Sequence, residues 1–126
     1  MYRLPCAKLL AAVLSLVAVI ASAGCGKLVV VGADRTLGLA LSEYRVNPQD
    51  VRVRSGSLTL VVHNYGRLTH NLVVSQAGVY DGVTKPIPPG QSTQLTLTLA
   101  PGRYDLASTL LSDQALGEYG ALTVAP

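Results

Sequence analysis

Four side chains of types that can do chemistry stand in two stretches of the chain. His70 lies in VVHNYGRLTHNLVV, and Ser108, Asp113 and Glu118 lie in PGRYDLASTLLSDQALGEYGALTV, between a turn and a strand pattern. One imidazole and two carboxylates can hold Zn²⁺, Cu²⁺ or Fe²⁺ with open coordination positions. A divalent-metal site is therefore one hypothesis, provided that the fold brings these residues together.

Ser108, His70 and Asp113 also include the residue types of a hydrolytic triad. A serine nucleophile of one widespread class stands on a tight glycine-rich elbow between a strand and a helix. Ser108 is instead expected within a strand, and no such elbow surrounds it. We therefore predict that the protein is not an enzyme.

The N-terminal stretch, MYRLPCAKLLAAVLSLVAVIASAGC, has the pattern of a secretory signal. Two basic residues precede an unbroken apolar run over residues 9–21, and small residues follow it. The run is shorter than the roughly 20 apolar residues of a transmembrane helix. The pattern therefore favours a cleaved signal helix.

Two processing sites fit the end of this signal. The tripeptide ASA, which ends at Ala23, suits ordinary signal peptidase, whereas SAGC, which ends at Cys25, resembles the lipobox of bacterial lipoproteins. We favour the lipobox, although Ser22 stands where that pattern usually has an aliphatic residue. The prediction is a signal peptide over residues 1–24 and a diacylated Cys25 on the outer face of the cytoplasmic membrane. Cleavage after Ala23 would give a secreted or periplasmic protein.

Removal of the signal leaves roughly 100 residues, enough for a single modest core. We expect a lipid-attached N-terminus and short linker over residues 25–34 and one domain over residues 35–126. Arg3 and Lys8 would leave with the signal, which lowers the net charge from +3 to about +1. This balance gives little support to a nucleic-acid partner.

The positions of the two cysteines also limit the chemistry of the domain. Cys6 lies in the signal, and Cys25 is the expected site of lipid attachment. The domain would then contain neither a disulfide nor a free thiol. Chemistry that needs a thiolate is excluded inside it.

The sequence from Lys27 onward has β patterning, with short runs of Val, Leu, Thr and Tyr between Gly, Pro, Asn and Asp. KLVVVG could form an edge strand. The segment VYDGVTKPIPPG is expected to be a surface connection, because its three prolines lack ladder donors. Alternation predicts that every second residue of four segments faces the core: Leu37, Leu39 and Leu41; Val51 and Val53; Leu58, Leu60 and Val62; Leu95, Leu97 and Leu99.

Three stretches together resemble the cupredoxins, the small β-sandwiches of the plastocyanin and azurin type. The resemblance is closer to the single-domain cupredoxin-like modules of bacterial secreted proteins and iron-uptake lipoproteins. It rests on SEYRVNPQDVRVRSG, on VVHNYGRLTHNLVV and on PGRYDLASTLLSDQALGEYGALTV, which occur in the family's order and cover about residues 41–124. The resemblance implies an all-β fold, an antiparallel Greek-key sandwich of cupredoxin type.

The family holds copper with a histidine, a cysteine, a second histidine and usually a methionine. Carried over position by position, these ligands fall on His70, Ser108, Asp113 and Glu118. A serine hydroxyl offers neither the charge nor the softness of a thiolate, so blue-copper electron transfer is the less favoured function. The resemblance implies a non-enzymatic binding or accessory module with a degenerate copper site and no cofactor.

One alternative keeps a metal ion at these positions. His70, Asp113 and Glu118 could hold a copper or zinc ion at a site that is not of type 1. The simpler interpretation is that the metal was lost and that polar side chains now occupy a solvent-exposed loop at the edge of the sandwich. His63 adds little to either, and Asn64 and Asn71 are expected to tie loops to the backbone. The sequence identifies no protein partner.

Overall fold

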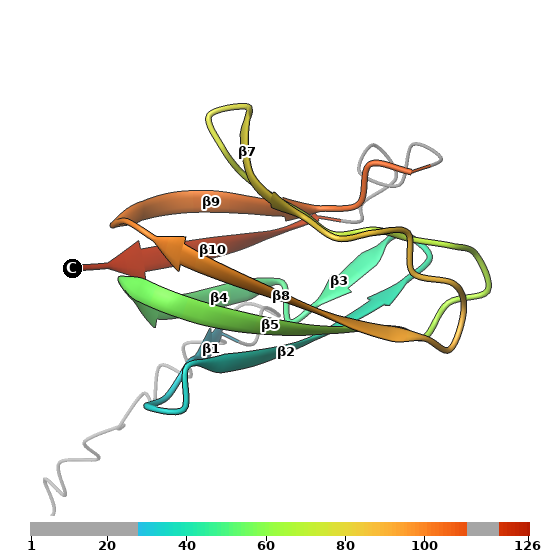
Figure 1. Ribbon diagram of the computed structural model, residues 1–126, viewed down its shortest axis with the longest axis horizontal. Helices are drawn as coiled ribbons and strands as arrows, with labels where there is room; N and C mark the ends of the chain where they lie inside the picture. Colours follow the sequence, from blue (N-terminus) through green and yellow to red (C-terminus); the bar gives the residue numbers. More distant parts are fainter. Residues whose placement is uncertain (1–27, 111–118) are drawn as a thin grey trace, which may run out of the picture.

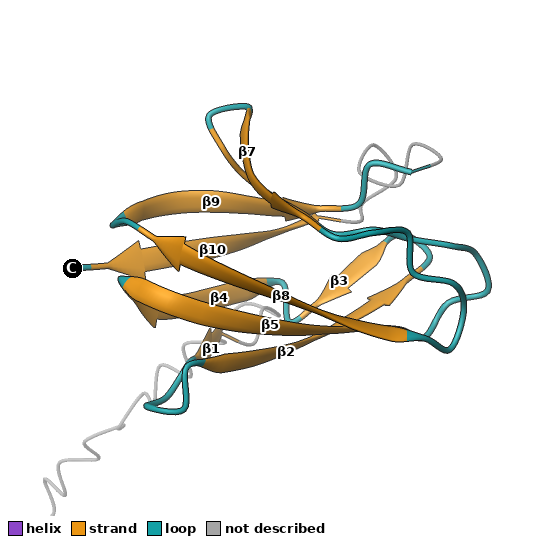
Figure 2. Ribbon diagram, viewed as in Figure 1, coloured by secondary structure: helices purple, strands orange, loops and turns teal. Residues whose placement is uncertain are grey.

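The protein is a sandwich of two β-sheets (Figure 1), seen in a computed structural model that describes residues 28–110 and 119–126. This part of the chain contains strands and loops but no helix (Figure 2), and so no helix in it is long and apolar enough to cross a membrane. The all-β class is confirmed. The expected signal helix lies outside the described residues.

Six strands form the first sheet and four form the second. The first has the spatial order β1 (Leu28–Val30), β4 (Asp50–Arg54), β10 (Tyr119–Ala125), β9 (Gly102–Ala107), β6 (Val73–Gln76) and β7 (Val79–Val83). The second has the order β3 (Arg45–Asn47), β2 (Thr36–Ser42), β5 (Gly56–Asn64) and β8 (Ser92–Leu99).

The sheets are mixed, whereas the sequence predicted antiparallel ladders. Strands β1 and β10 both run parallel to β4, and β2 runs parallel to β5, while the other pairs are antiparallel. Parallel neighbours need a crossover between them. The chain makes one from β2 to β5 by passing through β3 and then through β4 of the opposite sheet.

The core lies between the sheets, where the alternating residues meet. The predicted inward positions are buried, except that Leu95, near the start of β8, is only partly buried against the core. The core is aliphatic apart from Tyr104, whose hydroxyl donates to the carbonyl of Ala100 at 2.8 Å. The predicted core faces are therefore confirmed.

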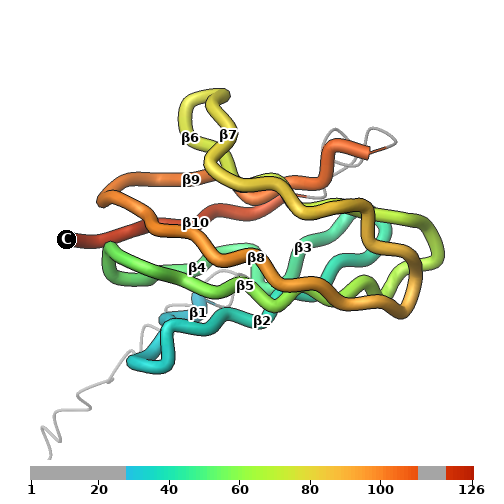
Figure 3. Tube along the Cα trace, in the orientation of Figure 1, coloured from blue at the N-terminus to red at the C-terminus, as the bar shows by residue number. Residues whose placement is uncertain are grey.

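Two segments expected as connections contribute edge strands. Val79–Val83 forms β7, which pairs antiparallel with β6 in a hairpin that stands away from the sandwich (Figure 3). The prediction of a surface connection is wrong for these residues, because the prolines begin only at Pro86 and leave the ladder donors of β7 intact. The edge strand that KLVVVG could form is confirmed, because Leu28–Val30, within the segment expected as a linker, forms β1 at the sheet edge and pairs with β4.

The loops gather at the two ends of the sandwich. One end holds the C-terminus and the β1–β2, β4–β5 and β8–β9 turns (Figure 1). The opposite end holds the β2–β3 turn, the β5–β6 connection, the connection before β8 and the end of β9. His70 belongs to this second end.

Candidate functional site

His70 is a buried residue in the connection between β5 and β6. Its backbone forms an isolated antiparallel bridge with Ile87, in which His70 N donates to Ile87 O at 3.2 Å and Ile87 N donates to His70 O at 2.7 Å. The side chain is fully shielded from solvent. The bridge fixes the backbone from which the imidazole projects.

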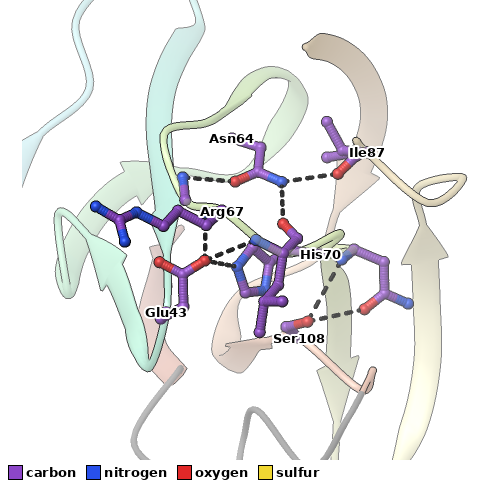
Figure 4. A network of polar contacts seen from close by, with 9 residues as sticks. Glu43, Asn64, Arg67, His70, Ile87 and Ser108 are labelled. Atoms are coloured by element: carbon purple, nitrogen blue, oxygen red, sulfur yellow. Dashed lines mark hydrogen bonds and ion pairs between the residues drawn. The ribbon is translucent and has the colours of Figure 1, made fainter. Parts of the chain in front are cut away.

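Asn64 organises the same loop from the end of β5. Its Oδ1 accepts a hydrogen bond from Gly66 N at 2.8 Å, and its Nδ2 donates to the carbonyls of Leu68 and Ile87, both at 2.8 Å (Figure 4). A side-chain amide that imitates a turn in this way holds a loop without regular secondary structure. The expectation that Asn64 ties the loop to the backbone is confirmed.

Glu43 reaches the loop from the turn between β2 and β3. Its Oε1 accepts the N–H of Arg67 and that of Leu68, the latter at 2.8 Å, and lies 3.5 Å from His70 Nε2 (Figure 4). These contacts lower the pKa of Glu43 from 4.5 to about 2. The hydrogen bond from the N–H of Leu68 is the largest cause of this lowering, and desolvation of the carboxylate opposes it. Hydrogen bonds from Arg67, from the amide of Glu43 itself and from His70 lower the pKa further.

Gly66 is the glycine that lets Glu43 approach His70. A Cβ atom at this position would overlap Oε1 of Glu43 and lie 3.0 Å from His70 Nε2. The residue therefore leaves the space in which carboxylate and imidazole meet. A glycine at this position thus permits the close approach of the Glu43 carboxylate to the His70 imidazole.

Ser108 follows β9 directly, rather than lying within a strand as predicted. Its hydroxyl is fully buried and donates to Asn71 Oδ1 at 3.2 Å, and the backbone N of Asn71 donates to Ser108 Oγ at 3.4 Å. Asn71 Oδ1 also accepts from the N–H of Thr109 at 2.8 Å, and Asn71 Nδ2 donates to Thr109 Oγ1 at 3.0 Å. Asn71, the residue after His70, thus links the connection between β5 and β6 to the residues that follow β9.

The structure brings two of the four predicted site residues to one end of the sandwich. His70 and Ser108 are buried there and are connected through Asn71, which is the residue after His70. Asp113 and Glu118 lie outside the described residues, as does Cys25. Within residues 28–110 and 119–126, no group of three His, Cys, Asp or Glu side chains could hold a metal ion.

His63 is separate from this cluster. It lies on β5, where its Nδ1 is hydrogen-bonded to Ser92 Oγ and its ring packs on that of Tyr65, with centroids 4.1 Å apart. These contacts make it part of the outer surface of the four-stranded sheet.

Sequence reasoning did not identify Glu43 as part of the site. The residue stands in the short segment between Leu41 and Val46, and nothing in its spacing relates it to His70. No local signal identifies it, because its backbone partners lie in a loop 24 and 25 residues further along the chain. The partners of such a residue depend on the tertiary fold.

The chain matches the family model described as "Cupredoxin-like domain" over residues 9–121. No curated protein sequence matches it. Reduced auracyanin from the photosynthetic bacterium Roseiflexus castenholzii is similar in structure, with 25% identity over 75% of this chain and 100% of that chain, and a TM-score of 0.68.

Two further solved structures show the same fold. Auracyanin A, described as a "blue" copper protein from Chloroflexus aurantiacus, is 15% identical over 75% of this chain and 98% of its own, with a TM-score of 0.63. A multicopper oxidase is 18% identical over 71% of this chain and 41% of its own, with a TM-score of 0.59.

Proposed function

Because the chain belongs to the cupredoxin-like family, we propose that it is an exported protein, anchored by lipid at Cys25, that acts as a binding or accessory module at the cell envelope. In this proposal it is not an enzyme and does not transfer electrons through type-1 copper. The likeness to a multicopper oxidase concerns the fold alone and covers 41% of that chain.

Ser108 is the observation that carries the proposal. A type-1 copper site has two histidines and a cysteine with a weak axial ligand, and its redox behaviour depends on the soft copper–thiolate bond. The oxygen of Ser108 is a buried hydroxyl that donates to Asn71. It supplies neither a negative charge nor a soft donor, so these residues do not fit a type-1 centre.

A copper titration tests this proposal. The chain from Gly26 onward, which contains no cysteine, is titrated with Cu²⁺ and then with Zn²⁺ while heat and visible absorption are recorded. We expect no binding tighter than that of a His70→Ala variant. Tight stoichiometric binding that disappears in the variant would replace the accessory role with a metal-handling one.

The metal-handling alternative has one observation of its own. A histidine that ligates a metal through one ring nitrogen usually presents the other to a carboxylate or a carbonyl. Nε2 of His70 lies 3.5 Å from the Glu43 carboxylate, an arrangement of this kind. His70, Asp113 and Glu118 would then be the donors, with Glu43 orienting the imidazole.

Substitutions of the two carboxylates distinguish this alternative from the adventitious binding of copper to a histidine. Asp113→Asn and Glu118→Gln should each weaken Cu²⁺ or Zn²⁺ binding by about tenfold or more if both carboxylates are ligands. Asp81→Asn, on the exposed strand β7, is the matched control. Equal affinities in all three variants would reject the three-residue site.

A further inference from the structure

A groove of about 450 Å³ opens at the end of the sandwich that is opposite to His70. Its apolar part includes Val30 of β1, Val53 of β4 and Ala125 of β10. The register explains this meeting, because Val30 pairs with Arg52, and Ala125 pairs with Arg54, in adjacent ladders of one sheet. Three strands therefore build the groove, with an apolar lining.

Three arginines complete the lining of the groove. Arg52 and Arg54 are exposed residues of β4 that alternate with the buried Val51 and Val53, so their side chains leave the outer face of the sheet next to the groove. Arg35 enters from the turn before β2. The lining includes no acidic side chain.

The side chain of Arg35 is held in place. Its Nε donates to the carbonyl of Ser57 at 2.7 Å, and its backbone N donates to Gly32 O at 3.2 Å. Its Nη2 is buried and has no hydrogen-bond acceptor in the part of the chain that the structure describes. One wall of the groove thus carries a fixed positive charge that is only partly satisfied.

The lining carries positive charge, and the nearby carboxylates stand outside it. Arg103 adds a further guanidinium across the sheet, because Thr123 pairs with both Arg103 and Arg52. The exposed carboxylates of Asp34, Asp50 and Asp105 lie in the same turn or on the same sheet face and are not part of the lining. A guanidinium cluster over an apolar surface is suited to an anionic phosphate that is joined to a hydrocarbon chain.

The position of β1 relates this surface to the membrane. Only Gly26 and Lys27 separate Cys25 from Leu28, so about 10 Å of chain links the expected lipid to the first residue of β1. On this edge strand Leu28 is 46% exposed and Val30 is 69% exposed. This step rests on the proposed lipid anchor, which would keep the groove close to the bilayer surface.

We propose that this groove is a docking site for the phosphate headgroups of anionic membrane phospholipids, with Arg52 and Arg54 as the principal contacts and Val30 against the interfacial hydrocarbon. The domain then rests on the membrane through this end and presents the His70 end to the opposite side. The lipid supplies attachment, and the arginines supply orientation.

Vesicle binding of the chain from Gly26 onward, which lacks both the signal and Cys25, tests the proposal without an attached lipid. Binding is measured by flotation on phosphatidylcholine vesicles with increasing phosphatidylglycerol, and the readout is the ratio of affinities for anionic and neutral vesicles. Arg52→Gln with Arg54→Gln should lower this ratio by about 25-fold, because each arginine near an anionic surface contributes roughly fivefold.

The matched control is Arg45→Gln with Lys85→Gln, which removes the same charge away from the groove. It should keep the ratio close to that of the parent, with thermal midpoints confirming that both variants fold. The docking site would be overturned if both double variants lowered the affinity ratio equally. It would also be overturned if the parent chain bound anionic and neutral vesicles with the same affinity. Displacement by millimolar inorganic phosphate at constant ionic strength would also overturn it, in favour of a free-anion site.

Failure of the lipid anchor is measured separately. Absence of labelled fatty acid on Cys25 of the full chain would reject the proposed anchoring, whereas the vesicle assay measures the contribution of the arginines in a chain that begins at Gly26 and cannot be acylated. The two results are therefore distinguishable.

Discussion

The carboxylate of Glu43 lies 3.5 Å from Nε2 of His70 and accepts the backbone N–H groups of Arg67 and Leu68. One side chain thus holds both the loop and the imidazole that the loop carries. The arrangement has consequences for stability that do not depend on whether a metal binds.

Acid should destabilise the fold through Glu43. Its pKa is about 2 in the folded protein and has an ordinary value of 4.5, so the folded state favours the ionised form. This contribution to stability is fully present above about pH 4.5 and is lost as the pH falls towards 2. The free energy of unfolding, measured with urea, should therefore change less between pH 4.5 and pH 2 in Glu43→Gln than in the wild type.

Asp81→Asn provides the control for the loss of one carboxylate, since Asp81 is exposed on β7. It should change the free energy of unfolding at neutral pH by no more than about 0.5 kcal/mol. If Glu43→Gln retains the wild-type dependence on pH between 4.5 and 2, the hydrogen bonds assigned to Glu43 do not favour its ionised form.

Gly66→Ala should destabilise the protein by about 1–3 kcal/mol, the range for inserting a methyl group into a packed site. The added Cβ would displace Glu43 from the N–H groups that it accepts. Gly38→Ala is the matched control, because nothing lies within 4 Å of its Cβ position. It should be neutral or stabilising by less than about 1 kcal/mol. Equal denaturation midpoints for the two variants would contradict this account of Gly66.

Tyr104→Phe should lower the free energy of unfolding by about 1 kcal/mol, since it removes a buried hydroxyl that donates to Ala100 O. The ring itself remains packed against the core. Tyr80→Phe, on the exposed hairpin, should change the stability by only a few tenths of a kcal/mol. Chemical denaturation of both variants at neutral pH measures the difference, and a Tyr104→Phe variant as stable as wild type would show that the hydrogen bond contributes nothing.

The sequence predicted the core faces well because local alternation determines them. Leu37, Leu39 and Leu41 face inward whatever lies beside their strand, since successive side chains point to opposite faces. The parallel pairing of β2 with β5 could not be predicted in this way. Strand direction depends on crossovers between the sheets, and alternation is the same in parallel and antiparallel ladders.

The site was predictable only where a motif carried it. His70 and Ser108 were identified by resemblance, and the structure connects them through Asn71. Glu43 was missed because its hydrogen bonds join a turn to a loop far along the chain. The groove was missed because the register of β4 with β1 and β10 brings Val30 and Ala125 beside Arg52 and Arg54. Long-range pairing of this kind leaves no periodic pattern in the sequence.

Ser108→Cys should create a copper–thiolate chromophore if Ser108 occupies the position of the family's cysteine ligand. The new thiolate would lie beside the backbone N of Asn71, the residue after His70, which is 3.4 Å from the present Ser108 oxygen. Addition of Cu²⁺ to this variant of the chain from Gly26 onward should give intense visible absorption, and Ser108→Ala should give none. A folded Ser108→Cys variant without that band would show that the position is not a ligand position.

Voltammetry of the wild-type chain from Gly26 onward, before and after the addition of one equivalent of Cu²⁺, tests the central claim most directly. The proposed loss of type-1 chemistry predicts no reversible one-electron wave attributable to protein-bound copper, because Ser108 cannot supply a thiolate. A reversible wave at one copper per chain, present in wild type and absent in His70→Ala, would contradict it.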